Sequence, residues 1–206
     1  MIETFTKEDF YKNVDLHIHS NMSDGNSTPS DILRMAMAKG LKYIAISDHN
    51  TLDAYKSDEI KNSSMVIPAV EFDCWYGLVF YHLLAYEIDV ESKVLEPFLA
   101  KDKRGSSKDM VRLFSFHRHP SKLIKAIHDA GGKAVLAHPA CCTTLNLERF
   151  VKKLVGYGLD GLEVYYPYSL RLSKLWRCAD SLYIEQLADK YNLIKTGGTD
   201  FHGCNM

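Results

Sequence analysis

Short apolar runs recur along this chain of 206 residues, and stretches with helical character separate most of them. Runs this short are typical of β-strands, because buried helices need a longer apolar pattern. The expected strands are residues 14–19, 42–47, 65–72, 79–88, 133–137, 161–164 and 193–196. Strands that alternate with helices build βαβ units and parallel sheets. The pattern predicts an α/β fold whose seven strands close into a distorted TIM-like barrel, with an open doubly wound sheet as the alternative.

Start and stop signals predict the helices between these runs. Thr28 can cap a helix with Pro29 in its first turn, and Gly40 can end it. The other expected helices are residues 52–61, 120–130, 146–156 and 173–191. Residues 90–119 are expected to form a surface loop between helical pieces. No second domain, repeat or low-complexity tract interrupts the pattern, so residues 1–206 are predicted to be a single domain.

Composition excludes several classes of function. The formal net charge is -1, so no broad basic field is available to attract long nucleic acid. The N-terminus lacks the basic start and apolar run of a signal peptide. No apolar stretch is long enough to span a bilayer, so no membrane partner is expected. The five cysteines show neither a disulfide framework nor a CxxC spacing. Together these features predict a cytoplasmic protein, whose oligomeric state the sequence leaves open.

Polar side chains occupy the first strand in an unusual way. Asp15, His17 and His19 alternate with apolar residues, so all three lie on one face of the strand. A strand face that points into a barrel should be apolar, because a buried imidazole or carboxylate without a partner is costly. A divalent cation would be such a partner. A solvated face is the alternative for this strand taken alone.

The same residue types recur at or near the ends of the later strands. They are His49 after the second strand, Glu71 in the third, His82 in the fourth, His138 after the fifth, and Asp200 and His202 after the seventh. The C-terminal ends of parallel strands converge on one mouth of a barrel. Imidazole and carboxylate without thiolate suit zinc, manganese or iron. The ligand candidates, Asp24 among them, exceed the needs of one ion, so two to three divalent ions are expected.

Several motifs in this order resemble the PHP (polymerase and histidinol phosphatase) family of metal-dependent phosphoesterases. They are DLHIHSNMSDG (15–25), ISDHNT (46–51), AVEF (69–72), YHLLAY (81–86), AVLAHP (134–139), GLEVYYP (161–167) and GGTDFHG (197–203). The resemblance implies a distorted seven-stranded β/α barrel and covers nearly the whole chain. Relatives often continue beyond the last motif, which leaves the closing C-terminal helix missing here or supplied otherwise.

The resemblance also implies a ligand set for three ions. The first ion would take His17, His19, Glu71 and Asp200; the second Asp24, His49 and His202; the third Glu71, His82 and His138. Asp15 and Asp48 would orient imidazoles from behind, because metal-bound histidines usually require such a partner. The alternative is that these two aspartates only cap or turn the chain. Relatives often grip phosphate with an arginine in a longer middle segment. Arg118 is the candidate for that role here.

The implied chemistry is hydrolysis of a small phosphomonoester or a short nucleotide by a metal-bound hydroxide, with Asp24 or His202 moving the proton. Two other functions remain open. An amidohydrolase acting on a C–N bond also places His-x-His after an opening barrel strand, although no lysine stands at a strand end to bridge its metals. A PHP module could instead bind metal without turnover, although every ligand position of the family is occupied.

Overall fold

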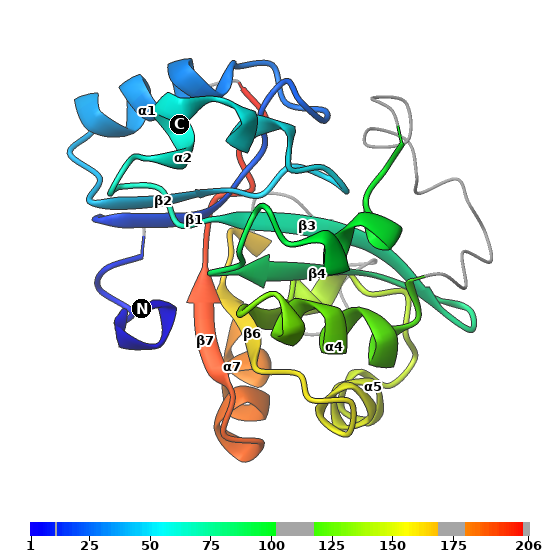
Figure 1. Ribbon diagram of the computed structural model, residues 1–206. Coiled ribbons are helices and arrows are strands. Elements are labelled where there is room, and N and C mark those ends of the chain that lie inside the picture. Colours follow the sequence, from blue (N-terminus) through cyan, green and yellow to red (C-terminus); the bar gives the residue numbers. More distant parts are fainter. Residues whose placement is uncertain (11, 102–117, 169–179, 204–206) are drawn as a thin grey trace.

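The structure is a computed structural model that describes residues 1–10, 12–101, 118–168 and 180–203. It has the expected α/β fold, with seven strands that belong to two sheets (Figure 1). The strands are β1 (Val14–Ile18), β2 (Tyr43–Ile46), β3 (Ala69–Tyr76), β4 (Val79–Tyr86), β5 (Lys133–Leu136), β6 (Gly161–Tyr165) and β7 (Ile194–Gly197). Strands β1 and β2 form one sheet, and β3 to β7 form the other in sequence order.

The direction of β4 differs from the expectation of an all-parallel sheet. Strand β4 runs antiparallel to both β3 and β5, whereas the pairs β1–β2, β5–β6 and β6–β7 are parallel. The reason is the link between β3 and β4, which consists only of Gly77 and Leu78. Two residues can join antiparallel strands but cannot make a parallel crossover. Gly77 has a φ of 60°, which suits a tight hairpin turn.

The expected closed barrel is not confirmed, because neither sheet closes on itself. In the described ranges, the strand pairing between the edges of the two sheets consists of isolated bridges. Ile18 bridges to Phe201 beyond the end of β7, and His49 bridges to Glu71 in β3. The sheets therefore enclose a common interior without a continuous ladder of hydrogen bonds around it.

The helices are α1 (Pro29–Ala38), α2 (Asp58–Lys61), α4 (Pro120–Asp129), α5 (Leu147–Val155) and α7 (Ser181–Lys190). Helices α1, α4 and α5 begin within a residue of the predicted positions. The hydroxyl of Thr28 accepts from the N–H of Asp31 at 3.1 Å, which confirms the predicted cap of α1. The helix expected over 52–61 is split by Ser57 into a 3-10 turn, η2 (Asp53–Lys56), and α2. The helix expected from 173 is described only from 181, and residues 169–179 lie outside the described ranges.

Three clusters of buried apolar residues surround the interior between the two sheets. Helices α1 and α2 cover the outer face of the two-stranded sheet through residues such as Ile32 and Ile60. Helices α4, α5 and α7 cover the five-stranded sheet. The third cluster fills the floor of the interior with Leu16, Leu84 and their neighbours. In the described ranges, no helix has the length and apolarity needed to cross a membrane.

Candidate metal centre

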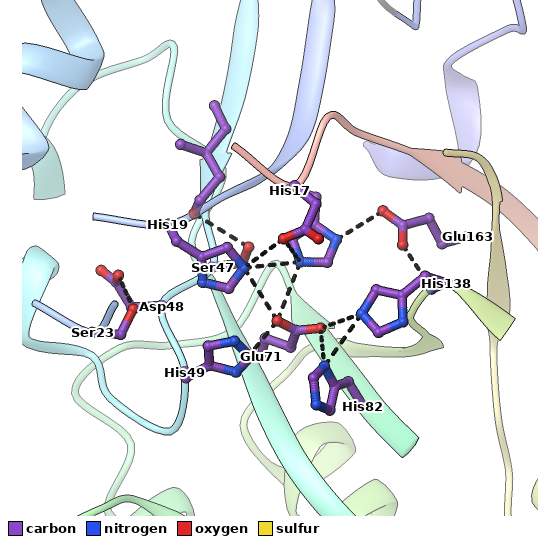
Figure 2. Close-up of polar contacts among 12 residues, drawn as sticks. His17, His19, Ser23, Ser47, Asp48, His49, Glu71, His82, His138 and Glu163 are labelled. Atoms are coloured by element: carbon purple, nitrogen blue, oxygen red, sulfur yellow. Dashed lines mark hydrogen bonds and ion pairs between the residues drawn. The ribbon is translucent and has the colours of Figure 1, made fainter. Parts of the chain in front are cut away.

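The nine predicted metal ligands gather in the interior between the two sheets. They are His17 in β1, His19 and Asp24 after it, His49 after β2, Glu71 in β3, His82 in β4, His138 after β5, and Asp200 and His202 after β7. Figure 2 shows the Glu71 carboxylate at the centre of the imidazoles. Within these side chains, four sets of donor atoms lie close enough together to hold an ion.

The first group joins His17, His19, Glu71 and Asp200. Nε2 of His17 lies 3.1 Å from Nε2 of His19 and 3.2 Å from Oε2 of Glu71. Nε2 of His19 lies 3.2 Å from the same Glu71 oxygen and 3.2 Å from Oδ1 of Asp200. Oδ1 of Asp200 is 3.6 Å from Nε2 of His17. Ligands about 2.1 Å from a tetrahedral ion lie roughly 3.4 Å apart, so these atoms have the spacing of a coordination shell.

The second carboxylate oxygen of Glu71 faces a different group. Oε1 lies 3.0 Å from Nδ1 of His82 and 3.1 Å from Nε2 of His138. The two imidazole nitrogens are 3.2 Å apart, so the three donor atoms form a nearly equilateral triangle. Glu71 therefore stands between two separate sets of histidines and offers one oxygen to each.

A third group around Asp24 is looser and more open. Its carboxylate oxygens lie 3.3 Å from Nε2 of His202 and 3.8 Å from Nε2 of His49. The ring of His19 stacks on both of these imidazoles, with centroid distances of 4.3 and 4.5 Å. The side chains of Asp24 and His202 are 35% and 33% exposed, whereas His17 and His19 are fully buried. Solvent thus reaches the centre on the side of Asp24 and His202.

The carboxylates in the centre favour positive charge beside them. Burial lowers the pKa of His17, but the carboxylates of Glu163, Glu71 and Asp200 outweigh it and raise that pKa well above its usual value. Burial raises the pKa of Glu71, yet the surrounding imidazoles hold it well below its usual range. Buried carboxylates therefore stay ionised and require positive charge beside them.

The donor atoms also fit divalent metal. Nε2 atoms of two buried histidines, His17 and His19, point at each other, which a shared cation would explain. Within the described ranges, Nδ1 of His19 is buried without a hydrogen-bond partner, at 3.7 Å from Asp24. Imidazole and carboxylate donors in this proportion suit zinc, manganese or iron. The residues present therefore fit the expected group of ions.

Two buried carboxylates that the sequence analysis missed contact the histidines, Glu163 through hydrogen bonds and Asp73 at ion-pair distance. Nδ1–H of His17 donates to Oε1 of Glu163 at 2.9 Å, and Oε2 of Glu163 accepts from the main-chain N–H of His138 at 2.7 Å. Asp73 lies 3.0 Å from Nδ1 of His49 and 3.1 Å from Nε2 of His82. Burial raises the pKa of Asp73, but His49 lowers it to about 2.

The sequence contains features that could have identified Asp73 and Glu163 as residues of the centre. Asp73 follows Glu71 by two positions and so shares its strand face. Glu163 interrupts the apolar run of β6 and is completely buried there. A carboxylate in such a run needs a partner, because burying its charge alone is costly, as it is for the polar residues of the first strand.

Asp15 and Asp48 hold loops in place and do not touch the imidazoles they were expected to orient, as far as the structure describes the chain. Asp15 accepts from the N–H and the hydroxyl of Thr199 at 2.9 and 2.6 Å. Asp48 accepts from Ser20 and Ser23, in the loop that carries Asp24. The carboxylates that contact the rings belong to Glu163, which faces His17 across the interior, and to Asp73, which lies opposite His82 in the β3–β4 hairpin.

Arg118, the candidate for phosphate binding, is buried with 1% of its surface exposed. Its guanidinium donates to the carbonyl oxygens of Phe98 and Asp73 at 2.8 and 3.2 Å. In this arrangement it supports the main chain of β3 behind Asp73. Its role in binding phosphate stays a prediction.

The sequence is similar to a known domain family and to several named proteins. A model of the PHP domain family matches residues 15–155. The chain is 26% identical to phosphoribosyl 1,2-cyclic phosphate 1,2-diphosphodiesterase of Eggerthella lenta, over 92% of this chain and 94% of that protein. It is 24% identical to 3',5'-nucleoside bisphosphate phosphatase of Chromobacterium violaceum (92% and 87% covered) and 23% identical to the 5'-3' exoribonuclease Rnm of Salmonella typhimurium (91% and 84% covered).

Solved structures share the fold. An amidohydrolase from Chromobacterium violaceum, with bound sulfate, superposes with a TM-score of 0.73 at 20% identity, covering 93% of this chain and 88% of that one. A chain from Bifidobacterium adolescentis superposes with a TM-score of 0.69 at 19% identity, covering 94% and 88%. At these identities the likeness concerns the fold alone.

Proposed function

This chain belongs to the PHP family of metal-dependent phosphoric ester hydrolases, and on that premise we propose that it hydrolyses a small phosphomonoester or a short nucleotide at a centre of three ions. The observation that carries the proposal is the position of Glu71. Its two oxygens face different sets of imidazoles at 3.0 to 3.4 Å, as a carboxylate shared by two ions would.

The ligand assignment follows the three groups of donor atoms. His17, His19, Glu71 and Asp200 would hold the first ion, and Glu71, His82 and His138 another. Asp24, His49 and His202 would hold the remaining ion on the open side of the centre. Divalent ions bound there would acidify a water molecule and offset the charge of a phosphate group.

The buried and the exposed side chains of the centre would have different roles. Glu163 and Asp73 fix the imidazole rings from behind, so that their nitrogens point into the centre. Asp24 and His202 lie at its exposed edge, 3.3 Å apart. Solvent and a leaving group would reach these two side chains first. Either one can accept or return the proton during hydrolysis.

Small phosphorylated substrates agree with the near-neutral charge of the chain. The relatives include a cyclic phosphodiesterase, a nucleoside bisphosphate phosphatase and an exoribonuclease, so a short nucleic acid end also belongs to the proposed range. Cleavage of a C–N bond is less well supported. In the described part of the chain the residue between the two sets of imidazoles is Glu71, and no lysine is among the buried polar residues.

The first experiment measures metal and turnover in one sample. Protein purified without chelator is analysed for bound metals and assayed with added manganese on a panel of phosphomonoesters, nucleotides and amide substrates. We expect two to three equivalents of metal and phosphate release that a chelator abolishes. Bound metal with no turnover on any ester would favour a non-catalytic module, and turnover of amides alone would favour the amidohydrolase reading.

Glu71→Gln tests the shared carboxylate directly. Because one side chain serves two groups of ligands, its neutralisation should remove two ions together and lower kcat by more than about 100-fold. Elemental analysis and steady-state kinetics measure both effects. Glu91→Gln, at a surface glutamate that pairs only with Lys61 among the described residues, is the control. A Glu71→Gln protein with full metal content and activity would refute the three-ion centre.

A further inference from the structure

The inner face of the β3–β4 hairpin continues past the metal centre as an aromatic pair. Side chains on a strand alternate between its faces, so Trp75 follows Glu71 and Asp73 on the face that points into the interior. On the partner strand, His82 lies opposite Asp73, and Phe80 lies opposite Trp75. Asp73 and His82 therefore form the pair nearer the centre. Trp75 and Phe80 form the next pair toward the tip of the hairpin.

These two rings adjoin the ligands. The ring centroids of Trp75 and Phe80 are 4.9 Å apart, and Phe80 stands edge-on to the ring of His82, also at 4.9 Å. His82 in turn places Nδ1 3.0 Å from Glu71. One ring therefore separates the indole of Trp75 from a proposed metal ligand.

The apolar core of the described structure does not account for this pair. Tyr76 and Val79, on the outer face of the same hairpin, pack against the core beneath α4 and α5. Trp75 and Phe80 belong to none of the three apolar clusters of the described chain, and both are partly exposed. Aromatic rings that stay partly exposed beside a polar centre are typical of a binding surface.

We propose that Trp75 and Phe80 form a wall on which the aromatic base of a nucleotide substrate stacks while its phosphate occupies the metal centre. The inference rests on the proposed function and narrows it to phosphate esters that carry a base one sugar away from the scissile group. Stacking on aromatic side chains tolerates any base, because every base presents a π-face. The wall therefore favours substrates that carry a base, but it does not distinguish one base from another.

Binding can be measured apart from turnover. The chain has two tryptophans, so a Trp176→Phe background leaves Trp75 as the only indole. Full-length, zinc-loaded protein of this background is mixed with adenosine 5′-monophosphate or ribose 5-phosphate in a stopped-flow fluorimeter, before substrate is consumed. We expect saturable quenching of Trp75 by the nucleotide and none by the sugar phosphate, because only the nucleotide brings a ring to stack.

Kinetics provide the second measurement. Trp75→Leu and Phe80→Leu keep an apolar side chain but remove the ring. Each should raise the KM for adenosine 5′-monophosphate by about 10- to 100-fold with a smaller change in kcat. The KM for ribose 5-phosphate should rise much less. Tyr76→Leu is the matched control, because this tyrosine lies on the outer face of the same hairpin with its hydroxyl 3.4 Å from that of Tyr157.

The two measurements separate the wall from the proposed function. A preference for the nucleotide over ribose 5-phosphate that survives both leucine substitutions would overturn the wall. Equal fluorescence responses to the two ligands would do the same. Failure of the wild-type protein to hydrolyse any phosphate ester would instead count against the proposed function. Specific quenching by the nucleotide would support the wall even then.

Discussion

Glu163 illustrates at the residue scale how a ligand depends on the residue behind it. The side chain is fully buried, and each of its oxygens has a separate task. One oxygen accepts from the ring of His17 and the other from the main chain of His138, so Glu163 fixes two proposed ligands of different groups. Such partners determine which ring nitrogen carries the proton and which faces the metal.

Glu163→Gln should weaken metal binding by about 10- to 100-fold, because an amide cannot accept from both neighbours as strongly as a carboxylate. Titration with zinc against a competing chelator measures the affinity. Glu148→Gln, at a partly exposed glutamate on α5 that binds Lys190, is the control. Unchanged zinc affinity in Glu163→Gln would mean that Glu163 serves only the packing of β6.

The residue types of the centre could be predicted from the sequence, but not all of their partners. His17 lies in β1 and His19 directly follows its last residue, so their common face follows from the alternation of side chains along an extended chain. The contact of His17 with Glu163 joins residues 146 positions apart. A local pattern carries no information on such a pair until the fold brings both strands together.

At the scale of elements, Asp15 ties the first strand to the end of the last. Its carboxylate on β1 accepts from Thr199, next to Asp200, near the bridge between Ile18 and Phe201. The two sheets share no continuous ladder at this edge. The bonds of Asp15 therefore help to hold the segment that carries Asp200 and His202 against β1.

Asp15→Ala should lower the free energy of unfolding by about 1–3 kcal/mol, because it leaves the partly buried donors of Thr199 without their acceptor. Urea unfolding monitored by circular dichroism measures the loss. Asp9→Ala is a matched control, since Asp9 makes the same pair of bonds to the N–H and hydroxyl of Thr6, but within one exposed turn. Equal destabilisation by the two substitutions would show that Asp15 does not join the sheets.

The direction of β4 was mispredicted because runs of apolar residues identify strands but not their orientation. The turn of Gly77 and Leu78 carried the missing information, since a link this short permits only a hairpin. The hairpin also places His82 opposite Asp73 and Phe80 opposite Trp75. Those pairings generate both the imidazole support and the proposed base-binding wall.

At the scale of the whole molecule, the proposed ions would join elements that the sheets leave unconnected. The donor atoms come from β1, β3 and β4 and from the segments after β1, β2, β5 and β7. A ligand that binds only the folded state stabilises it by mass action. Metal should therefore contribute to the stability of the protein as well as to catalysis.

Loading with zinc or manganese should raise the Tm by roughly 5–10 °C for each site filled at 100 times its Kd, which corresponds to about 2.7 kcal/mol for a chain of this size. Differential scanning calorimetry with and without chelator measures the shift. Glu71→Gln, which is expected to lose two of the three ions, should retain about one third of the shift. An equal Tm for loaded and chelated wild-type protein would contradict a metal centre formed by the folded state.

By itself the sequence determined the strands, the capped helices and the residue types of the centre, because each depends on neighbours within a few positions. Only the tertiary structure decided that Glu71 offers one oxygen to each of two groups, and that Glu163 and Asp73 support the imidazoles while Asp15 and Asp48 anchor loops. Those roles depend on which side chains meet across the interior. That is fixed by strand direction and register, and not by any local pattern.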